Sequence, residues 1–153
     1  INAFRGAGRR FEFLGEVNGV TIADDYAHHP TELEATLRAA KEMDYKRVWA
    51  VFQPFTYTRT QMLLDDFARV LQIADKVVMT EIMGSRERAE DYAVRTKDLA
   101  AKIPGSVWFD SFEKITGYVM AHAQPGDLIL TLGGGDIYKC ANLFVEKYLE
   151  KQS

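Results

Sequence analysis

Val20 to Leu37 reads VTIADDYAHHPTELEATL, and this stretch decides the fold. Its first four residues, Val20–Ala23, form a short apolar, β-branched run that is typical of a buried strand. Pro30 stands where the first residue of a helix is expected, because its missing N–H is not needed there and its fixed φ suits a helix. Apolar residues then follow on one helical face: Leu33, Leu37 and Ala40. The stretch therefore predicts a strand, a short link and a helix.

The link between this strand and this helix is rich in groups that bind ligands: Asp24, Asp25, Tyr26, His28 and His29. In an open α/β sheet such links lie at the carboxyl ends of the strands, where ligands bind. The carboxylates suit a sugar hydroxyl, a cation or a structural role, and the histidines suit either a site or a helix cap. Neighbouring side chains diverge and the spacing matches no usual zinc signature, so no metal site is predicted.

Length and composition describe one ordinary globular domain. The chain has 153 residues, of which 47% are hydrophobic and 27% charged, enough for a single core. Its formal net charge of -3 gives no reason to expect a nucleic-acid or membrane partner. Cys140 is the one cysteine, which fits a reducing, cytoplasmic compartment. The sequence begins at Ile1 without a signal peptide, and we expect a fragment of a longer protein.

The remaining chain alternates strands with helices. Phe11, Phe13 and Val17 alternate with polar residues up to Asn18-Gly19, the strongest short hairpin signal. Four further strands are predicted at Arg47–Phe52, Lys76–Thr80, Ser106–Phe109 and Asp127–Leu132. Helical stripes are predicted at Leu63, Phe67, Val70 and Leu71; at Leu99 and Ile103; at Ile115 and Val119 after Ser111 as N-cap; and at Ile137, Ala141, Phe144, Val145 and Leu149. This order predicts an α/β, Rossmann-like three-layer domain, with a mostly parallel sheet, an N-terminal antiparallel hairpin strand and helices on both faces.

Two other features are candidates for binding anions. Gly133, Gly134 and Gly135 follow the last strand and could present backbone N–H groups to an anion, although a tight turn is the simpler interpretation. They do not form a dinucleotide fingerprint, because Tyr138 occupies the position of its third glycine. Arg59 opens a helix and could receive a carboxylate, or it could be a solvated residue of the first turn.

Four motifs occur in an order that resembles the C-terminal domain of the Mur ligases. They are Gly8-Arg9-Arg10-Phe11-Glu12; Asp24-Asp25-Tyr26-Ala27-His28-His29-Pro30-Thr31-Glu32; Phe52-Gln53-Pro54 with Tyr57-Thr58-Arg59-Thr60; and Gly133-Gly134-Gly135-Asp136-Ile137 with Lys139. The resemblance covers essentially the whole chain and is closest to the members that join L-alanine to UDP-N-acetylmuramate.

The resemblance implies a ligase of peptidoglycan synthesis that uses ATP and Mg²⁺ and forms an acyl phosphate. Such an enzyme has three domains, and residues 1–153 would be the last one, without the UDP-sugar-binding domain and the central ATPase domain. Those domains would hold most of the contacts to ATP and Mg²⁺. The implied partners are L-alanine, UDP-N-acetylmuramate and the other two domains.

The resemblance also implies roles for individual residues. Arg10 and Asp25 would be catalytic residues that contact the nucleotide, Arg10 at its phosphates and Asp25 near its ribose, with Gly133, Gly134 and Gly135 on the same rim. The incoming amino acid would be bound by Tyr26, His28, His29 and Arg59. Phe55 and Thr56 depart from the family pattern, which often has histidine and then arginine or threonine there, and they make the expected pocket less polar.

Two alternative functions remain open. A related ligase that recycles murein tripeptide would share the domain and differ in its acceptor, although Tyr26 and the Tyr57-Thr58-Arg59 segment favour alanine. A free-standing nucleotide-binding regulatory module is the other alternative. A Gly-Thr-x-Gly-Lys-Thr loop in the same polypeptide would support a ligase.

Overall fold

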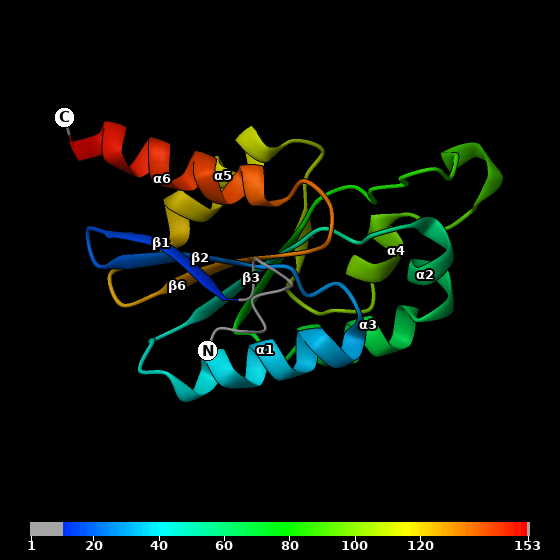
Figure 1. Ribbon diagram of the computed structural model, residues 1–153, viewed down its shortest axis with the longest axis horizontal. Helices are drawn as coiled ribbons and strands as arrows, with labels where there is room; N and C mark the ends of the chain where they lie inside the picture. Colours follow the sequence, from blue (N-terminus) through cyan, green and yellow to red (C-terminus); the bar gives the residue numbers. More distant parts are fainter. Residues whose placement is uncertain (1–10, 153) are drawn as a thin grey trace.

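A six-stranded sheet in the order β1-β2-β6-β3-β4-β5 forms the middle layer of the domain (Figure 1). The computed structural model describes residues 11–152. The strands are β1 (Glu12–Val17), β2 (Val20–Asp25), β3 (Val48–Phe52), β4 (Lys76–Met79), β5 (Val107–Trp108) and β6 (Leu128–Leu132). β1 is antiparallel to β2, and every other neighbouring pair is parallel. The predicted mostly parallel sheet with an N-terminal hairpin is thereby confirmed.

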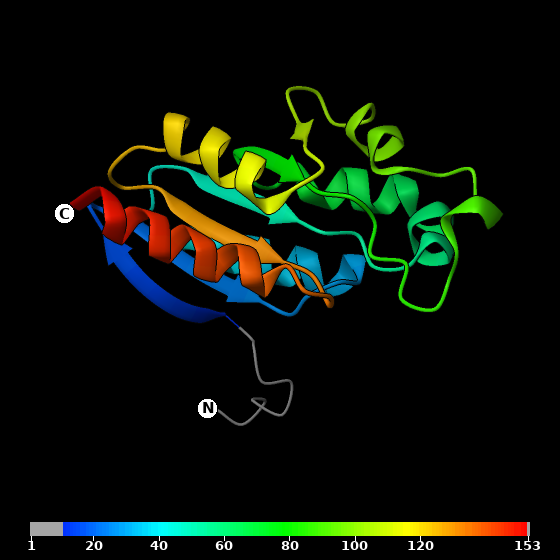
Figure 2. The same ribbon diagram turned by 90° about the horizontal axis from the view of Figure 1, so that it is seen from above.

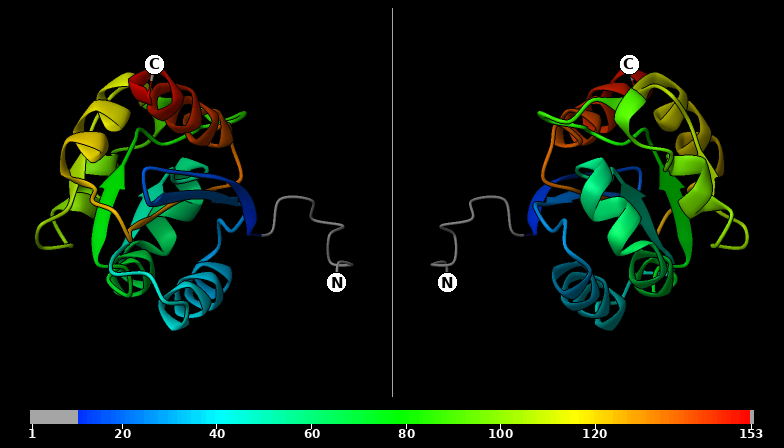
Figure 3. Two further views of the ribbon diagram at one scale, coloured as in Figure 1. Left: turned by 90° about the vertical axis from the view of Figure 1, so that its left-hand side faces the viewer. Right: turned by 90° about the vertical axis from the view of Figure 1, so that its right-hand side faces the viewer.

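Helices cover both faces of this sheet, as predicted (Figures 1 and 3). One face carries α1 (Pro30–Glu42), α3 (Leu64–Leu71) and α4 (Thr96–Ala100). The opposite face carries α5 (Phe112–His122) and α6 (Tyr138–Gln152). The short helix α2 (Tyr57–Met62) and the 3-10 turn η2 (Ala89–Asp91) lie beyond the sheet, at the end to which the parallel strands point (Figure 2).

The central strands explain the two-sided core. All residues of β3 and β6 are buried, because helices cover them above and below. Along β3, Ala50 and Phe52 pack toward α1 and α3, whereas Trp49 and Val51 pack toward α5 and α6. This alternation is the ordinary period of two of a strand, and it divides the core into two apolar clusters.

Local sequence signals determine one turn and the start of one helix. Asn18 and Gly19 both have positive φ, 56° and 82°, as a two-residue hairpin turn of the primed type requires. Pro30 is the first residue of α1, and Glu32 accepts a hydrogen bond from the backbone N–H of His29 at 3.3 Å. The predicted hairpin and the predicted start of α1 are both confirmed.

Several element boundaries differ from the predictions. The helix predicted around Leu63 is two helices, because Leu63 leaves the helical region with φ −114° and ψ 24° and separates α2 from α3. The predicted strand Ser106–Phe109 is reduced to the two residues of β5, and α4 ends before Ile103. Ile103 is nevertheless buried, and Ser111 caps α5 as predicted, accepting a hydrogen bond from the backbone N–H of Lys114 at 3.2 Å.

The buried face of α6 was also assigned partly wrongly. Leu149 is 52% exposed, whereas Tyr148 is 5% exposed and belongs to the core. Phe144 and Tyr148 are four residues apart and share one face, so the next residue points about 100° away from the core. The apolar character of Leu149 therefore did not decide its environment.

An ion pair at the amino end of β6 links distant segments. The carboxylate of Asp127, 1% exposed, accepts hydrogen bonds from Arg47 Nη2 at 2.9 Å and from Trp49 Nε1 at 3.0 Å. The backbone N–H of Gln124 donates a further hydrogen bond at 3.0 Å. Asp127 therefore ties β3 to the turn before β6, at the end of the sheet opposite the candidate site.

Candidate functional site

The carboxyl ends of three neighbouring strands meet at one edge of the sheet (Figure 2). Asp25 ends β2 opposite Leu132 of β6, and Leu132 lies opposite Phe52 of β3. The backbone N–H of Gly133 donates to the carbonyl of Asp25 at 3.3 Å, and that of Gln53 donates to the carbonyl of Leu132 at 3.0 Å. The links after the three strands therefore leave the sheet side by side, as the position of a ligand site requires.

Asp25 holds several segments together at this edge. Its carboxylate is 2% exposed, and Oδ2 accepts hydrogen bonds from the Phe11 N–H at 2.9 Å and the Thr36 hydroxyl at 3.3 Å. Oδ1 accepts the N–H of Ala27 at 2.8 Å. These bonds join the start of the hairpin, the link and α1. Arg10 lies outside the described residues, so its predicted proximity to Asp25 stays a prediction.

His28 connects the link after β2 with the link after β3. Its ring packs edge-on against Tyr26 and Phe55, with ring centroids 5.2 Å and 5.9 Å away. His28 Nδ1 lies 3.0 Å from the carbonyl oxygen of Tyr26, and because a carbonyl only accepts, Nδ1 carries the hydrogen. The other ring nitrogen of neutral His28 is then an acceptor. The departure at Phe55 thus supplies an aromatic contact to a predicted site residue.

His29 has a structural role at the start of α1. It is the N-cap of α1, and its Nδ1 accepts the backbone N–H of Thr31 at 3.4 Å. Capping was one of the alternatives open for the histidines. His29 and Arg59, both predicted to bind the amino acid, line the same cavity.

The glycine loop packs tightly against the neighbouring links. A Cβ added to Gly134 would lie 3.0 Å from His28 Nδ1, and one added to Gly135 would lie 2.6 Å from Gln53 Oε1. Gly133 has φ +151°, a conformation that L side chains rarely adopt. The described contacts of this loop are therefore those of a tight, closely packed turn, which was the simpler of the two interpretations.

Gly133→Ala is expected to lower the free energy of unfolding by about 1–3 kcal/mol. The added Cβ would meet the carbonyl oxygen of Gln53 at 3.0 Å and Ile137 Cγ2 at 3.1 Å, in an unfavourable backbone conformation. Urea denaturation measures the change. Gly117→Ala is the matched control, because nothing lies within 4 Å of the added Cβ. That control should stabilise α5 by about 0.5–1 kcal/mol, and equal losses in both variants would contradict the argument.

The segment between β3 and α2 holds a strained residue. Thr56 has φ 68° and ψ 143°, which is unusual for a β-branched residue. Its N–H donates to the carbonyl of Met83 at 2.8 Å, and Met83 N–H donates to the carbonyl of Pro54 at 2.9 Å. The Thr56 hydroxyl accepts the N–H of Arg59 at 3.2 Å, so Thr56 also caps α2. Pairing with Met83 thus holds the strained segment in place.

Arg59 lines a cavity of about 450 Å³. The cavity is lined by residues of α2 and of the links around it: His29, Thr56, Thr58, Arg59, Met62, Leu63 and Glu87. Arg59 Nη1 is buried, and within residues 11–152 it has no hydrogen-bond partner. A buried guanidinium nitrogen without a partner is costly unless an acceptor occupies the cavity, and a carboxylate matches its geometry.

Glu87 also lines this cavity, although the sequence did not identify it as a candidate site residue. It comes from the link between β4 and η2. Its Oε1 accepts the N–H groups of Tyr57 at 2.5 Å and Thr58 at 3.1 Å. The contact joins residues about thirty positions apart, so no local sequence signal could have identified it.

A second hollow of about 340 Å³ lies at the same edge and is lined in part by Gln53. Gln53 is 5% exposed, and its Nε2 donates to Asp136 Oδ1 at 2.8 Å. Its Oε1 is buried and has no hydrogen-bond partner in the described part of the chain. Gln53 therefore belongs to the polar lining of the edge, which agrees with its place in one of the four sequence motifs.

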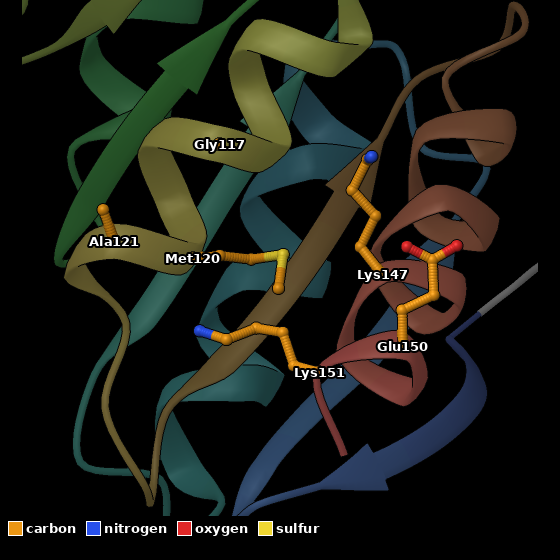
Figure 4. A pocket seen from close by; sticks show the side chains of 6 residues that line it. All are labelled: Gly117, Met120, Ala121, Lys147, Glu150 and Lys151. Carbon is orange, nitrogen blue, oxygen red and sulfur yellow. The ribbon is translucent and has the colours of Figure 1, made fainter. Parts of the chain in front are cut away.

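A third hollow, of about 420 Å³, lies on the outer side of α5 and α6 (Figure 4). Met120 reaches from α5 toward α6, and Lys151 reaches from α6 toward α5. Both residues lie in the second halves of their helices, whereas the glycine loop precedes the first turn of α6. None of the predicted site residues within 11–152 lines this hollow.

Residues 11–152 lack two kinds of feature. Between residues 11 and 152, no group of three or more His, Cys, Asp or Glu side chains is arranged to hold a metal ion. Within the same range, no helix has the length and apolar character needed to cross a membrane.

Comparison with known proteins agrees with this geometry. Over 150 residues, the chain is 43% identical to the UDP-N-acetylmuramate--L-alanine ligase of Acetivibrio thermocellus, covering 95% of this chain and 32% of the relative. The chain thus spans about a third of the length of the curated relatives it matches. It resembles the solved structure of the UDP-N-acetylmuramate-alanine ligase MurC from Thermotoga maritima, with a TM-score of 0.76 and 25% identity. That match covers 94% of this chain and 30% of the other.

A murein peptide ligase shares the same fold. The solved structure of the enzyme from Psychrobacter arcticus matches with a TM-score of 0.72 and 26% identity, covering 92% of this chain and 30% of the other. Residues 9–135 match the family described as "Mur ligase, glutamate ligase domain". This range includes the edge built by Asp25, Arg59 and the glycine loop. The chain therefore belongs to the family of Mur ligase C-terminal domains.

Proposed function

We propose that this domain is the C-terminal part of an ATP-dependent ligase that adds L-alanine to UDP-N-acetylmuramate in the cytoplasm. In this reaction the lactyl carboxylate takes the γ-phosphoryl group of ATP, and the amine of L-alanine then displaces phosphate to form the amide. The similarity to relatives of that name, at 43% identity over 95% of this chain, supports the proposal. The whole enzyme would contain a UDP-sugar-binding domain and a central ATPase domain as well.

The observation that carries the proposal within the domain is the guanidinium of Arg59. Its buried Nη1 has no acceptor in the described residues, and Arg59 lines a cavity that His29 also lines. A guanidinium there would bind the carboxylate of L-alanine through paired hydrogen bonds and leave the amine free to attack. Tyr26 and His28 would lie beside the same substrate, because the His28 ring contacts the segment that leads into α2.

The nucleotide would meet the adjacent part of the edge. We propose that Asp25 and the loop Gly133, Gly134 and Gly135 face the ATP, together with Arg10, whose guanidinium would stabilise charge on the transferring phosphoryl group. Mg²⁺ would neutralise phosphate charge during the transfer. ATP and Mg²⁺ would be held mainly by the central domain.

Two assays test the proposal. The full-length protein is expected to form the amide from L-alanine, UDP-N-acetylmuramate and ATP, whereas residues 1–153 alone should not hydrolyse ATP. The reason is that half of the phosphate site would lie on another domain, and closure of the two domains would be needed to exclude water. Product formation and phosphate release are the measurements. Robust ligation by the isolated domain would contradict the proposed division of the site.

The same assays separate the alternative functions. Because the fold is similar to that of a murein peptide ligase, murein tripeptide should be tested as the acceptor in place of L-alanine. Preference for the tripeptide would replace the alanine assignment. A polypeptide without a P-loop that binds nucleotide and ligates neither compound would instead be a regulatory module.

A further inference from the structure

The carboxylate of Glu87 completes the N-terminus of α2 from outside the helix. Oε1 accepts the N–H groups of Tyr57 and Thr58, and Oε2 accepts the Thr58 hydroxyl at 2.5 Å. The N-cap Thr56 satisfies a different N–H, that of Arg59. The first N–H groups of a helix have no acceptor within the helix. Glu87 Oε1 and the Thr56 hydroxyl supply the acceptors that are otherwise missing.

The link that carries Glu87 runs alongside α2 and is firmly built (Figure 2). Arg95 donates to the carbonyl oxygens of Tyr92 and Val94, both at 2.7 Å, and to that of Ala89 at 3.1 Å. The Tyr92 ring stacks on Tyr57 with centroids 5.6 Å apart and an interplanar angle of 11°. The Arg95 guanidinium lies 5.6 Å from the centre of the Tyr57 ring. The link is thus held by hydrogen bonds between its own residues and by contacts with Tyr57, the first residue of α2.

α2 depends on contacts from outside the helix. It spans only Tyr57–Met62, and a helix this short is not stable by itself in water. Its N-cap, Thr56, has a strained backbone conformation, and its last residue, Met62, is 74% exposed. The hydrogen bonds of Glu87 and the ring contact of Tyr92 therefore help to determine the orientation of α2.

Glu87 also acts on Arg59 by charge. The hydrogen bond from Thr58 holds the pKa of Glu87 below its usual range, against the effect of burial, and Arg59 contributes to the lowering. Glu87 is thus an anion at neutral pH, and it lines the same cavity as Arg59. Its charge also suits the N-terminus of a helix.

From this geometry we infer that Glu87 is a positioning residue for Arg59: it fixes α2 and orients the guanidinium toward the cavity. The inference rests on the proposed function, in which Arg59 binds the carboxylate of L-alanine. Glu87 itself would not touch the reacting atoms, because its two oxygens accept bonds from Tyr57 and Thr58. Its loss should therefore weaken binding of the amino acid and leave the nucleotide unaffected.

Steady-state kinetics of the full-length ligase test the inference. Glu87→Ala is expected to raise the KM for L-alanine about tenfold or more, with the KM for ATP changed less than about twofold. Glu87→Gln should restore part of the affinity, because its amide oxygen can accept both N–H groups and its amide nitrogen can donate to Thr58. Glu90→Ala is the matched control, since Glu90 is in the same link and pairs with the exposed Arg88.

A double-mutant cycle distinguishes positioning from a general structural effect. In an Arg59→Ala background, Glu87→Ala should cause no further rise in the KM for L-alanine, because it acts through Arg59. Additive effects, an unchanged KM, or equal rises for ATP and L-alanine would overturn the inference. If Glu87→Ala does not fold, the same cycle with Glu87→Gln gives the answer. A wild-type enzyme that does not ligate L-alanine would overturn the proposed function instead.

Discussion

Asp127→Ala is expected to lower the free energy of unfolding by about 3 kcal/mol. The carboxylate is buried, and its loss leaves the charge of Arg47 and the indole N–H of Trp49 without their acceptor. Removing one partner of such a pair costs more than the pair itself contributes, because the remaining polar groups stay out of water. Arg47 is about one-third exposed, which keeps the loss at the lower end of the usual range.

Urea denaturation measures this loss, and the ion pair between Asp110 and Lys114 supplies the control. Its two side chains are 58% and 61% exposed, so Asp110→Ala should cost less than about 1 kcal/mol. A similar loss in both variants would show that burial does not determine the contribution of Asp127.

The contribution of Asp127 should also depend on pH. Burial raises the pKa of Asp127, but the hydrogen bonds from Arg47, Gln124 and Trp49 outweigh burial and hold it below its ordinary value. A depressed pKa in the folded state stabilises the fold above the unfolded-state pKa of about 4, and the contribution disappears as the pH falls through the folded-state pKa. The stability difference between wild type and Asp127→Asn should therefore shrink below about pH 4. A difference that stays constant under acid conditions would contradict this.

Arg59→Ala in the full-length ligase is expected to raise the KM for L-alanine about 100-fold, with a smaller change in kcat. The variant removes the buried Nη1 and with it the proposed partner of the substrate carboxylate. Because a carboxylate binds in the ground state as well as in the transition state, its loss should be seen mainly as weaker binding. Initial rates at varied L-alanine and saturating ATP measure the effect.

Two variants of α2 control this experiment. Arg59→Lys keeps the charge and loses the planar pair of donors, so it should bind L-alanine with intermediate KM. Gln61→Ala changes an exposed residue of the same helix that does not line the Arg59 cavity, and it should leave the KM unchanged. A large fall in kcat with unchanged KM in Arg59→Ala would assign Arg59 to the phosphoryl transfer instead.

The sequence by itself determined the elements whose signals are local. Asn18-Gly19 specified the hairpin, since few residues accept positive φ, and Pro30 specified the start of α1. The uninterrupted apolar runs of β3 and β6 indicated strands covered on both faces. Polar groups at the end of β2 led to the prediction of a site at the carboxyl ends of the strands, because parallel strands end together.

Only the tertiary structure decided what depends on contacts between distant residues. It separated α2 from α3 at Leu63, and it buried Tyr148 in place of Leu149. It also brought Glu87 to the N-terminus of α2, across about thirty residues of chain. Periodicity assigns a helical face to within about 100°, and it contains no information about which other segment will satisfy an exposed N–H. Those outcomes depend on how the links pack at the edge of the sheet, which no single stretch of sequence specifies.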